Sequence, residues 1–217
     1  MRIIAITDIH GRRVQVERIA EIAKEKNVDA IIVSGDLSRY KSIEEATEIL
    51  KVLGVNKTFY IPGNMDDPKI CEINLRGVEC IHERVISYMG YSIAGLGGSL
   101  KGPFNTPFEM TEKQILEKLK NLVRNIDGKN LILVVHNPPY NTKADAIGEY
   151  EHIGSKSIRM IIEEIKPVLV LCGHAHEARS MDRINGTIIV NPGPLMYGYY
   201  AEIKINGEVE VELLRIA

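Results

Sequence analysis

Short aliphatic runs, each followed at once by a polar block, recur along most of the chain. The five runs are Ile3 to Ile6, Ala30 to Val33, Phe59 to Ile61, Leu131 to Val135 and Val168 to Leu171. Continuous apolar runs of this length predict strands that are buried on both faces of a sheet. If the strands lie parallel in one sheet, we expect the polar blocks to emerge at its carboxyl edge, where open α/β sheets place their sites.

The polar blocks contain side chains that metal ions prefer. They are Asp8-Ile9-His10, Gly35-Asp36, Gly63-Asn64-Met65-Asp66, His136-Asn137 and Gly173-His174-Ala175-His176. Taken singly, each block has an ordinary interpretation, because Asp, Asn and Gly after a strand often serve only to form a turn. Taken together, ligand-type residues at five successive strand ends favour one site. Their mixture of oxygen and imidazole groups predicts a pair of divalent first-row metals.

The spacing within the blocks indicates how the ligands are shared. Alternate side chains of an extended segment point the same way, so Asp8 and His10 are expected to chelate one ion, and His174 and His176 have the same spacing. Asp36 offers two oxygens and can bridge two ions, which lie about 3.5 to 4 Å apart in sites of this type. Further expected ligands are Asn64 and His136.

Other patterns predict helices and hairpins around these strands. Helices are expected over Arg12 to Lys26, Ser42 to Gly54, Asp67 to Gly77, Thr111 to Ile126 and Ile158 to Ile165. Ser42 and Thr111 each begin a capping box. Short runs between Val78 and Ala94 predict an antiparallel meander, and Asn-Gly turns predict hairpins between Arg183 and Leu214.

Two long segments without periodicity, Gly95 to Met110 and Asn137 to Gly154, are predicted to be loops. Loops of this length in compact domains are often functional. The glycines from Gly95 to Gly98 suggest a dinucleotide-binding turn, but no helical pattern follows them. We therefore favour a loop that faces a substrate.

The composition narrows the class of protein. The chain has 217 residues with a formal net charge of -2, so we expect one domain over residues 1–217 and no nucleic-acid polymer as partner. Neither a signal peptide nor a membrane-spanning run is visible, so we expect a cytoplasmic protein, with a homo-oligomer left open. Three cysteines without a CxxC pair indicate neither a disulfide framework nor a thiolate zinc site, and Cys172 is expected in the core.

In their order, the five blocks resemble the signature of the calcineurin-like metallophosphoesterase superfamily, which runs DxH, GDxx, GNH[D/E], a lone His and GHxH. The match extends from Asp8 to His176, and the chain looks like the smaller single-domain branch. The resemblance implies an α/β fold that is a two-sheet α/β/β/α sandwich. It implies one ion held by Asp8, His10, Asp36 and His176, and another held by Asp36, Asn64, His136 and His174. The ligand types suit Mn, Fe, Ni, Co or Zn, with Mn favoured.

The third block departs from the family pattern. The family has a histidine that contacts phosphate where this chain has Met65, and a thioether is a poor donor. Asp66 matches the family's acidic position and is expected to orient a neighbouring histidine. His152, a spare histidine in the second loop, is interpreted either as an exposed loop residue or as a phosphate contact and general acid. His82 is expected to be a surface strand residue.

The leading hypothesis is a dinuclear hydrolase of small phosphate esters, a phosphodiesterase rather than a monoesterase, in which a metal-bridging hydroxide attacks phosphorus in line. The catalytic candidates are Asp36, Asn64, Asp66 and His152. The alternatives are a phosphomonoesterase or protein phosphatase of the same fold, and a non-catalytic metal-binding interaction module. A nuclease is disfavoured because the chain lacks a DNA-capping domain and a basic surface.

Overall fold

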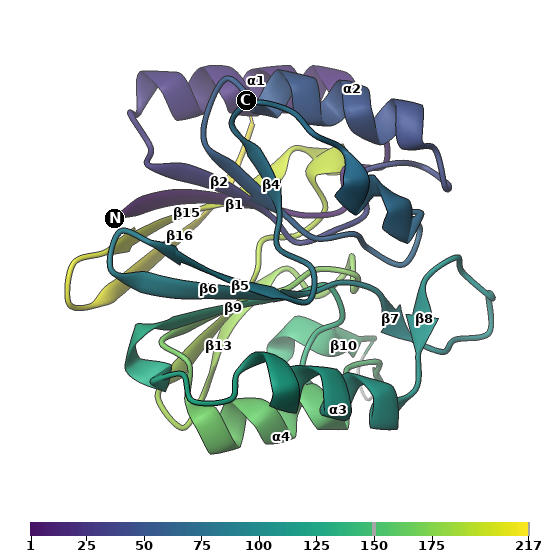
Figure 1. The fold of residues 1–217 in the computed structure, drawn as a ribbon, viewed down its shortest axis with the longest axis vertical. Coiled ribbons are helices and arrows are strands. Elements are labelled where there is room, and N and C mark those ends of the chain that lie inside the picture. The colour runs from purple at the N-terminus through teal and green to yellow at the C-terminus, as the bar shows by residue number, and fades with distance from the viewer. Residues whose placement is uncertain (149–150, 217) are drawn as a thin grey trace.

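The computed structural model describes residues 1–148 and 151–216, and it is a four-layer α/β/β/α sandwich (Figure 1). Two six-stranded sheets face each other. Helices α1 (Arg13–Glu25) and α2 (Ile43–Leu53) cover the outer face of one sheet, and α3 (Glu112–Leu122) and α4 (Lys156–Ile165) cover the outer face of the other. The two-sheet sandwich predicted from the sequence is therefore confirmed.

The first sheet is built mainly from the N-terminal part of the chain. Its order is β16 (Val209–Arg215), β15 (Tyr199–Ile205), β1 (Arg2–Ile6), β2 (Ala30–Val33), β3 (Thr58–Tyr60) and β4 (Val78–Cys80). Strands β1 to β4 are parallel, whereas β15 and β16 add an antiparallel hairpin beside β1. The first three polar blocks thus follow neighbouring parallel strands.

The second sheet carries the other two polar blocks. Its order is β13 (Ser180–Ile184), β14 (Thr187–Asn191), β12 (Leu169–Leu171), β9 (Leu131–Val135), β6 (Tyr91–Leu96) and β5 (Arg84–Tyr88). The five runs do not share one sheet, because β9 and β12 pair with β6 and β14 instead of with β1 to β3. An aliphatic run marks a buried strand but does not say which neighbour it pairs with.

The meander predicted between Val78 and Ala94 is only half correct. Strands β5 and β6 do form an antiparallel hairpin, but β4 lies parallel to β3 in the other sheet. The tail hairpins are as predicted, with Asn185 and Gly186 both at positive φ in the turn between β13 and β14. That backbone suits Asn-Gly sequences because both residues tolerate the left-handed region.

The alternation of side chains along the central strands explains why the aliphatic runs are continuous. Ile4 and Ile6 of β1 pack under α1 and α2, whereas Ile3 and Ala5 point to the layer between the sheets. In β9, Leu133 likewise packs against α3 and α4 from the opposite face to its neighbours. Both faces of each central strand are therefore apolar, as helices on one side and a sheet on the other require.

The helix starts agree with the capping signals of the sequence. Thr111 and Gln114 form the predicted capping box of α3. Ser42 accepts the backbone N–H of Glu45 at 3.1 Å, but the Glu45 carboxylate accepts from the backbone N–H of Arg39 instead of returning to Ser42. The capping box at Ser42 is therefore half formed, and the Glu45 carboxylate holds the loop that precedes α2 in place.

The two segments predicted as loops contain short elements. The first holds β7 (Ser99–Leu100) and β8 (Glu109–Met110), which pair with each other. The second holds the 3₁₀ turn η3 (Lys143–Asp145) and strands β10 (Ala146–Ile147) and β11 (Glu151–His152). Three other 3₁₀ turns in the described residues are η1 (Pro68–Glu72), η2 (Gly128–Asn130) and η4 (Leu195–Tyr197). The helix predicted from Asp67 to Gly77 is thus only η1, capped by Asp67.

The sequence indicated no disulfide framework, but two of the three cysteines are paired. Cys71 in η1 and Cys80 at the end of β4 form a disulfide, with their Cα atoms 5.2 Å apart. An odd count cannot exclude one pair beside a free thiol, and the fold brings η1 back beside β4 at a separation that suits the bond. Cys172 is buried and free, as expected.

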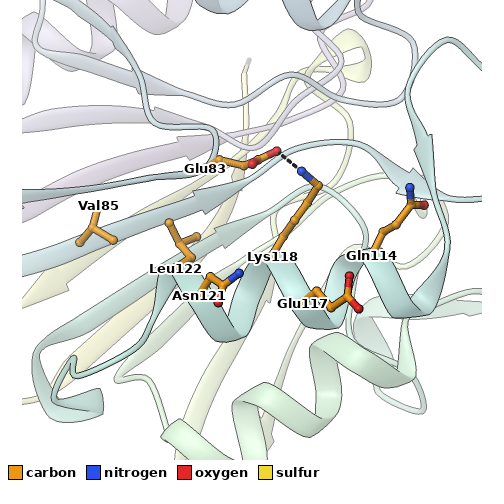
Figure 2. Close-up of a pocket in the computed structure, with 7 residues that line it drawn as sticks. All are labelled: Glu83, Val85, Gln114, Glu117, Lys118, Asn121 and Leu122. Carbon is orange, nitrogen blue, oxygen red and sulfur yellow. Dashed lines mark hydrogen bonds and ion pairs between the residues drawn. The ribbon is translucent and has the colours of Figure 1, made fainter.

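His82 is not the surface strand residue that we expected. Its Nδ1 accepts the backbone N–H of Gly97 at 2.9 Å, and burial lowers the pKa of the imidazole. The neighbouring Glu83 reaches Lys118 of α3, with Oε1 and Nζ 2.6 Å apart, across a surface groove beside β5 (Figure 2). His82 therefore holds the end of β6 in place.

No helix among the described residues combines the length and apolar character that crossing a membrane requires.

Candidate metal centre

The polar blocks of both sheets meet because the loops that carry them are bonded to one another. The backbone N–H of Asp8 donates to the carbonyl of Gly35 at 3.0 Å, and the backbone N–H of Gly173 donates to the carbonyl of His136 at 3.0 Å. The backbone N–H of His174 then donates to the Asp8 carboxylate at 3.1 Å, which joins the two sheets. The backbone of the site is thus fixed by its own hydrogen bonds.

Four residues of the blocks have left-handed backbone conformations. The φ angles are 51° at Asp8, 45° at His10, 53° at Asp36 and 68° at His174. The expectation that Asp8 to His10 and His174 to His176 are extended is therefore wrong, since the chain bends sharply after β1 and β12. Non-glycine residues at positive φ are uncommon and gather at functional sites, where surrounding structure holds them.

Two glycines allow the loops to approach closely. Gly35 has a φ of 108°, which suits only glycine. A side chain at Gly63 would overlap the carboxylate and backbone of Asp36. The absence of a side chain at Gly63 thus lets Asp36 and Asn64 lie in the same pocket.

One half of the site gathers around Asp8. The Nε2 atom of His176 lies 3.3 Å from Asp8 Oδ1 and 3.3 Å from Nε2 of His10. His10 Nε2 lies 3.6 Å from Oδ2 of Asp36. Ligand-type atoms of Asp8, His10 and His176 all lie within 4.8 Å of one another, which is close enough to hold one metal ion.

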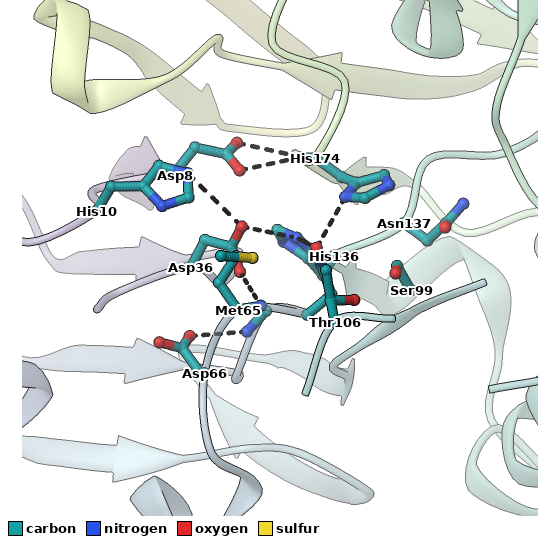
Figure 3. Close-up of polar contacts among 12 residues, drawn as sticks. Asp8, His10, Asp36, Met65, Asp66, Ser99, Thr106, His136, Asn137 and His174 are labelled. Carbon is teal, nitrogen blue, oxygen red and sulfur yellow. Dashed lines mark hydrogen bonds and ion pairs between the residues drawn. The ribbon is translucent and has the colours of Figure 1, made fainter. Parts of the chain in front are cut away.

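The other half gathers around His136, which Figure 3 shows beside Asp36 and His174, and around Asn64. The Asn64 side-chain oxygen lies 2.9 Å from His136 Nε2 and 2.8 Å from His174 Nδ1. Asp36 Oδ2 lies 3.5 Å from His136 Nε2. Asp8, Asp36 and His136 form a second group with ligand-type atoms within 4.8 Å of one another. His10 and His176 thus lie together in one half, His136 and His174 lie on either side of Asn64 in the other, and Asp8 lies near both halves.

The charges of the two halves depend on one another. Burial alone would raise the pKa of Asp8 and of Asp36, but the surrounding imidazoles outweigh it and lower both values. Burial would lower the pKa of His136, yet the Asp36 and Asp8 carboxylates raise it to about 9. Burial and the nearby His136 lower the pKa of His174 to about 4. The two carboxylates thus stay ionised and attract positive charge.

The donor set fits divalent metal ions. His136 Nδ1 lies 2.7 Å from the carbonyl oxygen of Ser34 and therefore donates to it. This leaves His136 Nε2 facing the oxygens of Asn64 and Asp36, two acceptors, so a proton or a metal cation must lie between them. An imidazole whose second nitrogen donates to a carbonyl is the usual arrangement of a metal-binding histidine.

The sequence profile of the family described as "Metallophosphoesterase, calcineurin superfamily" matches residues 37–216. The chain belongs to this family. Its members typically bind two divalent metal ions, and the two clusters of ligand-type atoms are candidates for that role here. The chain is thus a metallophosphoesterase, and the resemblance seen in the sequence is confirmed.

Relatives and solved structures resemble this metallophosphoesterase over most of its length. An uncharacterized protein of Methanocaldococcus jannaschii is 39% identical over 207 residues, which cover 92% of this chain and 91% of the relative. The crystal structure of TT1561 of Thermus thermophilus has a TM-score of 0.79 at 21% identity, with 99% of this chain and 98% of that chain covered. A dimetal phosphatase of Danio rerio has a TM-score of 0.69 at 10% identity, with coverages of 98% and 95%. The two structural likenesses concern the fold.

Asp66 has a different role from the one expected of it. Its buried carboxylate accepts the backbone N–H groups of Leu37 at 3.0 Å, Ser38 at 2.8 Å and Gly63 at 2.9 Å. The expectation that it orients a histidine is therefore wrong. Burial and the nearby Asp36 raise the pKa of Asp66 despite these bonds. Asp66 instead fastens the loop after Asp36 to the loop that contains Asn64.

Met65 and His152 lie on different sides of the metallophosphoesterase site. Met65 lines a hollow together with His10, Asp36 and His176, and its backbone N–H donates to Asp36 Oδ1 at 2.8 Å. His152 lines a second hollow that also contains Asn64 and His174. Its Nδ1 lies 2.8 Å from Oδ1 of the buried Asp145, so its hydrogen bond goes to Asp145 rather than to the clustered ligands.

Sequence reasoning missed several residues around the clustered ligands. Tyr40 and Phe104 expose large aromatic side chains beside them, and Tyr140 lines the hollow that contains His152. Asp145 was missed too, although a carboxylate in the same loop as a spare histidine is a usable signal. The aromatic residues could not be predicted, because the local sequence around a loop aromatic does not indicate whether it lies near a site.

Proposed function

We propose that this metallophosphoesterase is a dinuclear metal-dependent phosphodiesterase that hydrolyses small phosphate esters. Asp8, His10, Asp36 and His176 hold one divalent ion, and Asp36, Asn64, His136 and His174 hold the other. The ions are drawn from Mn, Fe, Ni, Co and Zn, with Mn favoured. When bound, two such ions lower the pKa of water and polarise the phosphoryl oxygens.

The position of Asp36 carries this proposal. Its Oδ2 atom lies 3.6 Å from Nε2 of His10 and 3.5 Å from Nε2 of His136, so one carboxylate oxygen faces both halves of the site. The other oxygen, Oδ1, accepts the backbone N–H of Met65 at 2.8 Å. The carboxylate is thus held in one orientation, with Oδ2 where a single oxygen would contact an ion in each half.

The remaining residues prepare the pocket for an ester. Asn64 and His174 belong to the clustered ligands and also line the larger hollow, so a phosphoryl group at the cluster has one substituent directed toward that hollow. Asp66 holds the loop after Asp36 against the loop that contains Asn64, because its carboxylate accepts backbone N–H groups from both loops. We assign His152 to a contact with the ester or to proton donation to its leaving oxygen, with Asp145 Oδ1, 2.8 Å from Nδ1, holding the ring in place.

Met65 supports a diester rather than a monoester. A monoester has a dianionic phosphoryl group that benefits from an additional donor, and a thioether supplies none. A diester has one charge fewer and a second substituent. The hollow lined by Met65, with a volume of about 470 Å³, has room for that substituent beside the clustered ligands.

The experiment is a comparison of bis(4-nitrophenyl) phosphate with 4-nitrophenyl phosphate, using chelator-treated protein reconstituted with Mn²⁺. We expect metal-dependent turnover of both, with a higher kcat/KM for the diester. Turnover by chelator-treated protein without added metal would show that hydrolysis does not depend on a metal ion. A higher kcat/KM for the monoester would contradict the diester assignment while leaving the family assignment intact.

A further inference from the structure

Two hollows flank the clustered ligands and share part of their walls. The larger has a volume of about 750 Å³ and the smaller about 470 Å³, and Asn64, Phe104, Thr106 and His174 line both. The larger volume is in the range of roughly 300 to 1,000 Å³ that small-molecule sites occupy. A phosphodiester centred on the clustered ligands therefore has separate space for each of its two substituents.

The larger hollow presents aromatic rings. The rings of Tyr140 and His152 have centroids 5.8 Å apart, and the ammonium of Lys156 lies 5.2 Å from the Tyr140 ring centroid. Phe104, which stands at the border between the hollows, is 85% exposed. An exposed ring keeps its hydrophobic surface in water, and a flat group stacked on it would recover that free energy.

The charged groups of this hollow do not favour a second anion. Lys101 and Lys156 line it, but so do three acidic residues, Glu109, Glu112 and Glu151. Glu112 and Glu109 are occupied by hydrogen bonds from Ser155 and Thr106, yet both keep their negative charge because these bonds help to lower their pKa values despite burial. A second phosphate would therefore meet more negative than positive charge.

We propose that the larger hollow binds one substituent of the phosphodiester, and that this substituent is an uncharged planar heterocycle on a sugar, of the size of a nucleoside. The rings of Tyr140 and Phe104 stack on the heterocycle, and the charged side chains of the wall bind its hydroxyl and amino groups. An alkyl chain would desolvate those charged groups without pairing them. This inference rests on the proposed phosphodiesterase activity, and it specifies which diesters are substrates.

The test uses two methyl phosphodiesters that differ only in the large substituent, adenosine 5′-methyl phosphate and octyl methyl phosphate. We expect the Mn²⁺-loaded protein to cleave the adenosine diester with a kcat/KM at least about tenfold higher, the scale of one stacked base. Tyr140→Leu and Phe104→Leu should each lower that value by on the order of tenfold, and should lower the kcat/KM for the octyl diester by much less, because an alkyl chain cannot stack. Tyr197→Leu is the matched control, because this exposed ring lines a different hollow.

Binding of adenosine itself separates failure of this inference from failure of the proposed function. Ligand-observed NMR should show that wild-type protein binds adenosine, and that Tyr140→Leu binds it on the order of tenfold more weakly. If neither diester is cleaved, the phosphodiesterase assignment fails while this binding measurement still decides the role of the hollow. Equal or better cleavage of the octyl diester, or adenosine binding unchanged in Tyr140→Leu, would overturn the inference.

Discussion

The Nε2 atoms of His10 and His176 lie 3.3 Å apart, although 166 positions separate the two residues in the chain. Each imidazole also faces a carboxylate, with Asp36 Oδ2 3.6 Å from His10 and Asp8 Oδ1 3.3 Å from His176. Two nitrogens and two carboxylate oxygens therefore converge from both sheets. Such a set attracts a cation and gives little stability without one, so we interpret it as a ligand shell.

The first prediction concerns Asp36→Asn, which should lower kcat by at least about a hundredfold, because altering even an outer partner of a metal site costs 10- to 100-fold. The amide oxygen can still accept the Met65 N–H, and asparagine tolerates the φ of 53°, so the fold should survive. Asp127→Asn is the matched control, an exposed carboxylate that only caps η2. The measurement is kcat of both variants, after circular dichroism has shown that they are folded. Near-wild-type turnover in Asp36→Asn would show that Asp36 is not the bridging ligand.

Metal affinity should fall as the pH falls. Without metal, Asp36 and Asp8 hold the pKa of His136 at about 9, so a bound ion must displace a proton from this imidazole at any lower pH. We expect the Mn²⁺ affinity to weaken by about tenfold per pH unit below pH 9, and activity to be highest at neutral to alkaline pH. Titration with buffered Mn²⁺ between pH 6 and 9 measures this, and a constant affinity over that range would be the contrary result.

Substitution at Met65 should change the choice of ester. Met65→His places a donor beside Asp36 and His10, where a dianionic phosphoryl group gains from it, so the ratio of monoester to diester kcat/KM should rise. Met65→Leu, which is similar in size and has no donor, should keep the wild-type ratio. An unchanged ratio in Met65→His would show that this position does not select the ester class.

Glu112 links the starts of α3 and α4, and its contribution to stability should depend on pH. Burial would raise the pKa of Glu112, but hydrogen bonds from Ser155, Ser157 and the backbone N–H of Lys156 outweigh it and lower the pKa. A carboxylate with a lowered pKa in the folded state stabilises the fold above its unfolded pKa of about 4.3, and this stabilisation is lost as the pH falls through the folded value.

Glu112→Gln should therefore lower the free energy of unfolding by about 1–2 kcal/mol at pH 7, and the difference from wild type should shrink in acid. Urea unfolding at pH 7 and at pH values below 4 measures it. The control is Glu117→Gln on the exposed face of the same helix, where a change under about 0.5 kcal/mol is expected. A difference between wild type and Glu112→Gln that is constant with pH would contradict the charge-based account.

Periodicity was sufficient to predict the buried strands and the polar blocks at their ends, whereas the two-sheet sandwich was implied by the family resemblance. Continuous aliphatic runs predict strands covered on both faces, and a polar block after such a strand must lie at the edge of a sheet. The sheet to which each strand belongs could not be predicted, since β4 and β9 have patterns that suit either one. Pairing depends on contacts between residues far apart in the chain, which a local pattern does not contain.

The details of the site were beyond a local pattern for the same reason. The left-handed conformations of Asp8 and His10 arise from hydrogen bonds to the loop after β2, so an extended segment was the natural but wrong expectation. Asp66 looked like a partner for a histidine, yet the fold places three backbone N–H groups nearer to it. The Cys71–Cys80 disulfide likewise depends on how η1 turns back to β4.

Metal stoichiometry tests the central claim most directly. Protein stripped with a chelator, reconstituted with Mn²⁺ and freed of excess ion should retain two ions per chain by elemental analysis, because Asp36 faces both groups of ligand-type atoms. We predict two equivalents for wild-type protein and fewer for Asp36→Asn. One ion or fewer per wild-type chain would contradict the dinuclear centre.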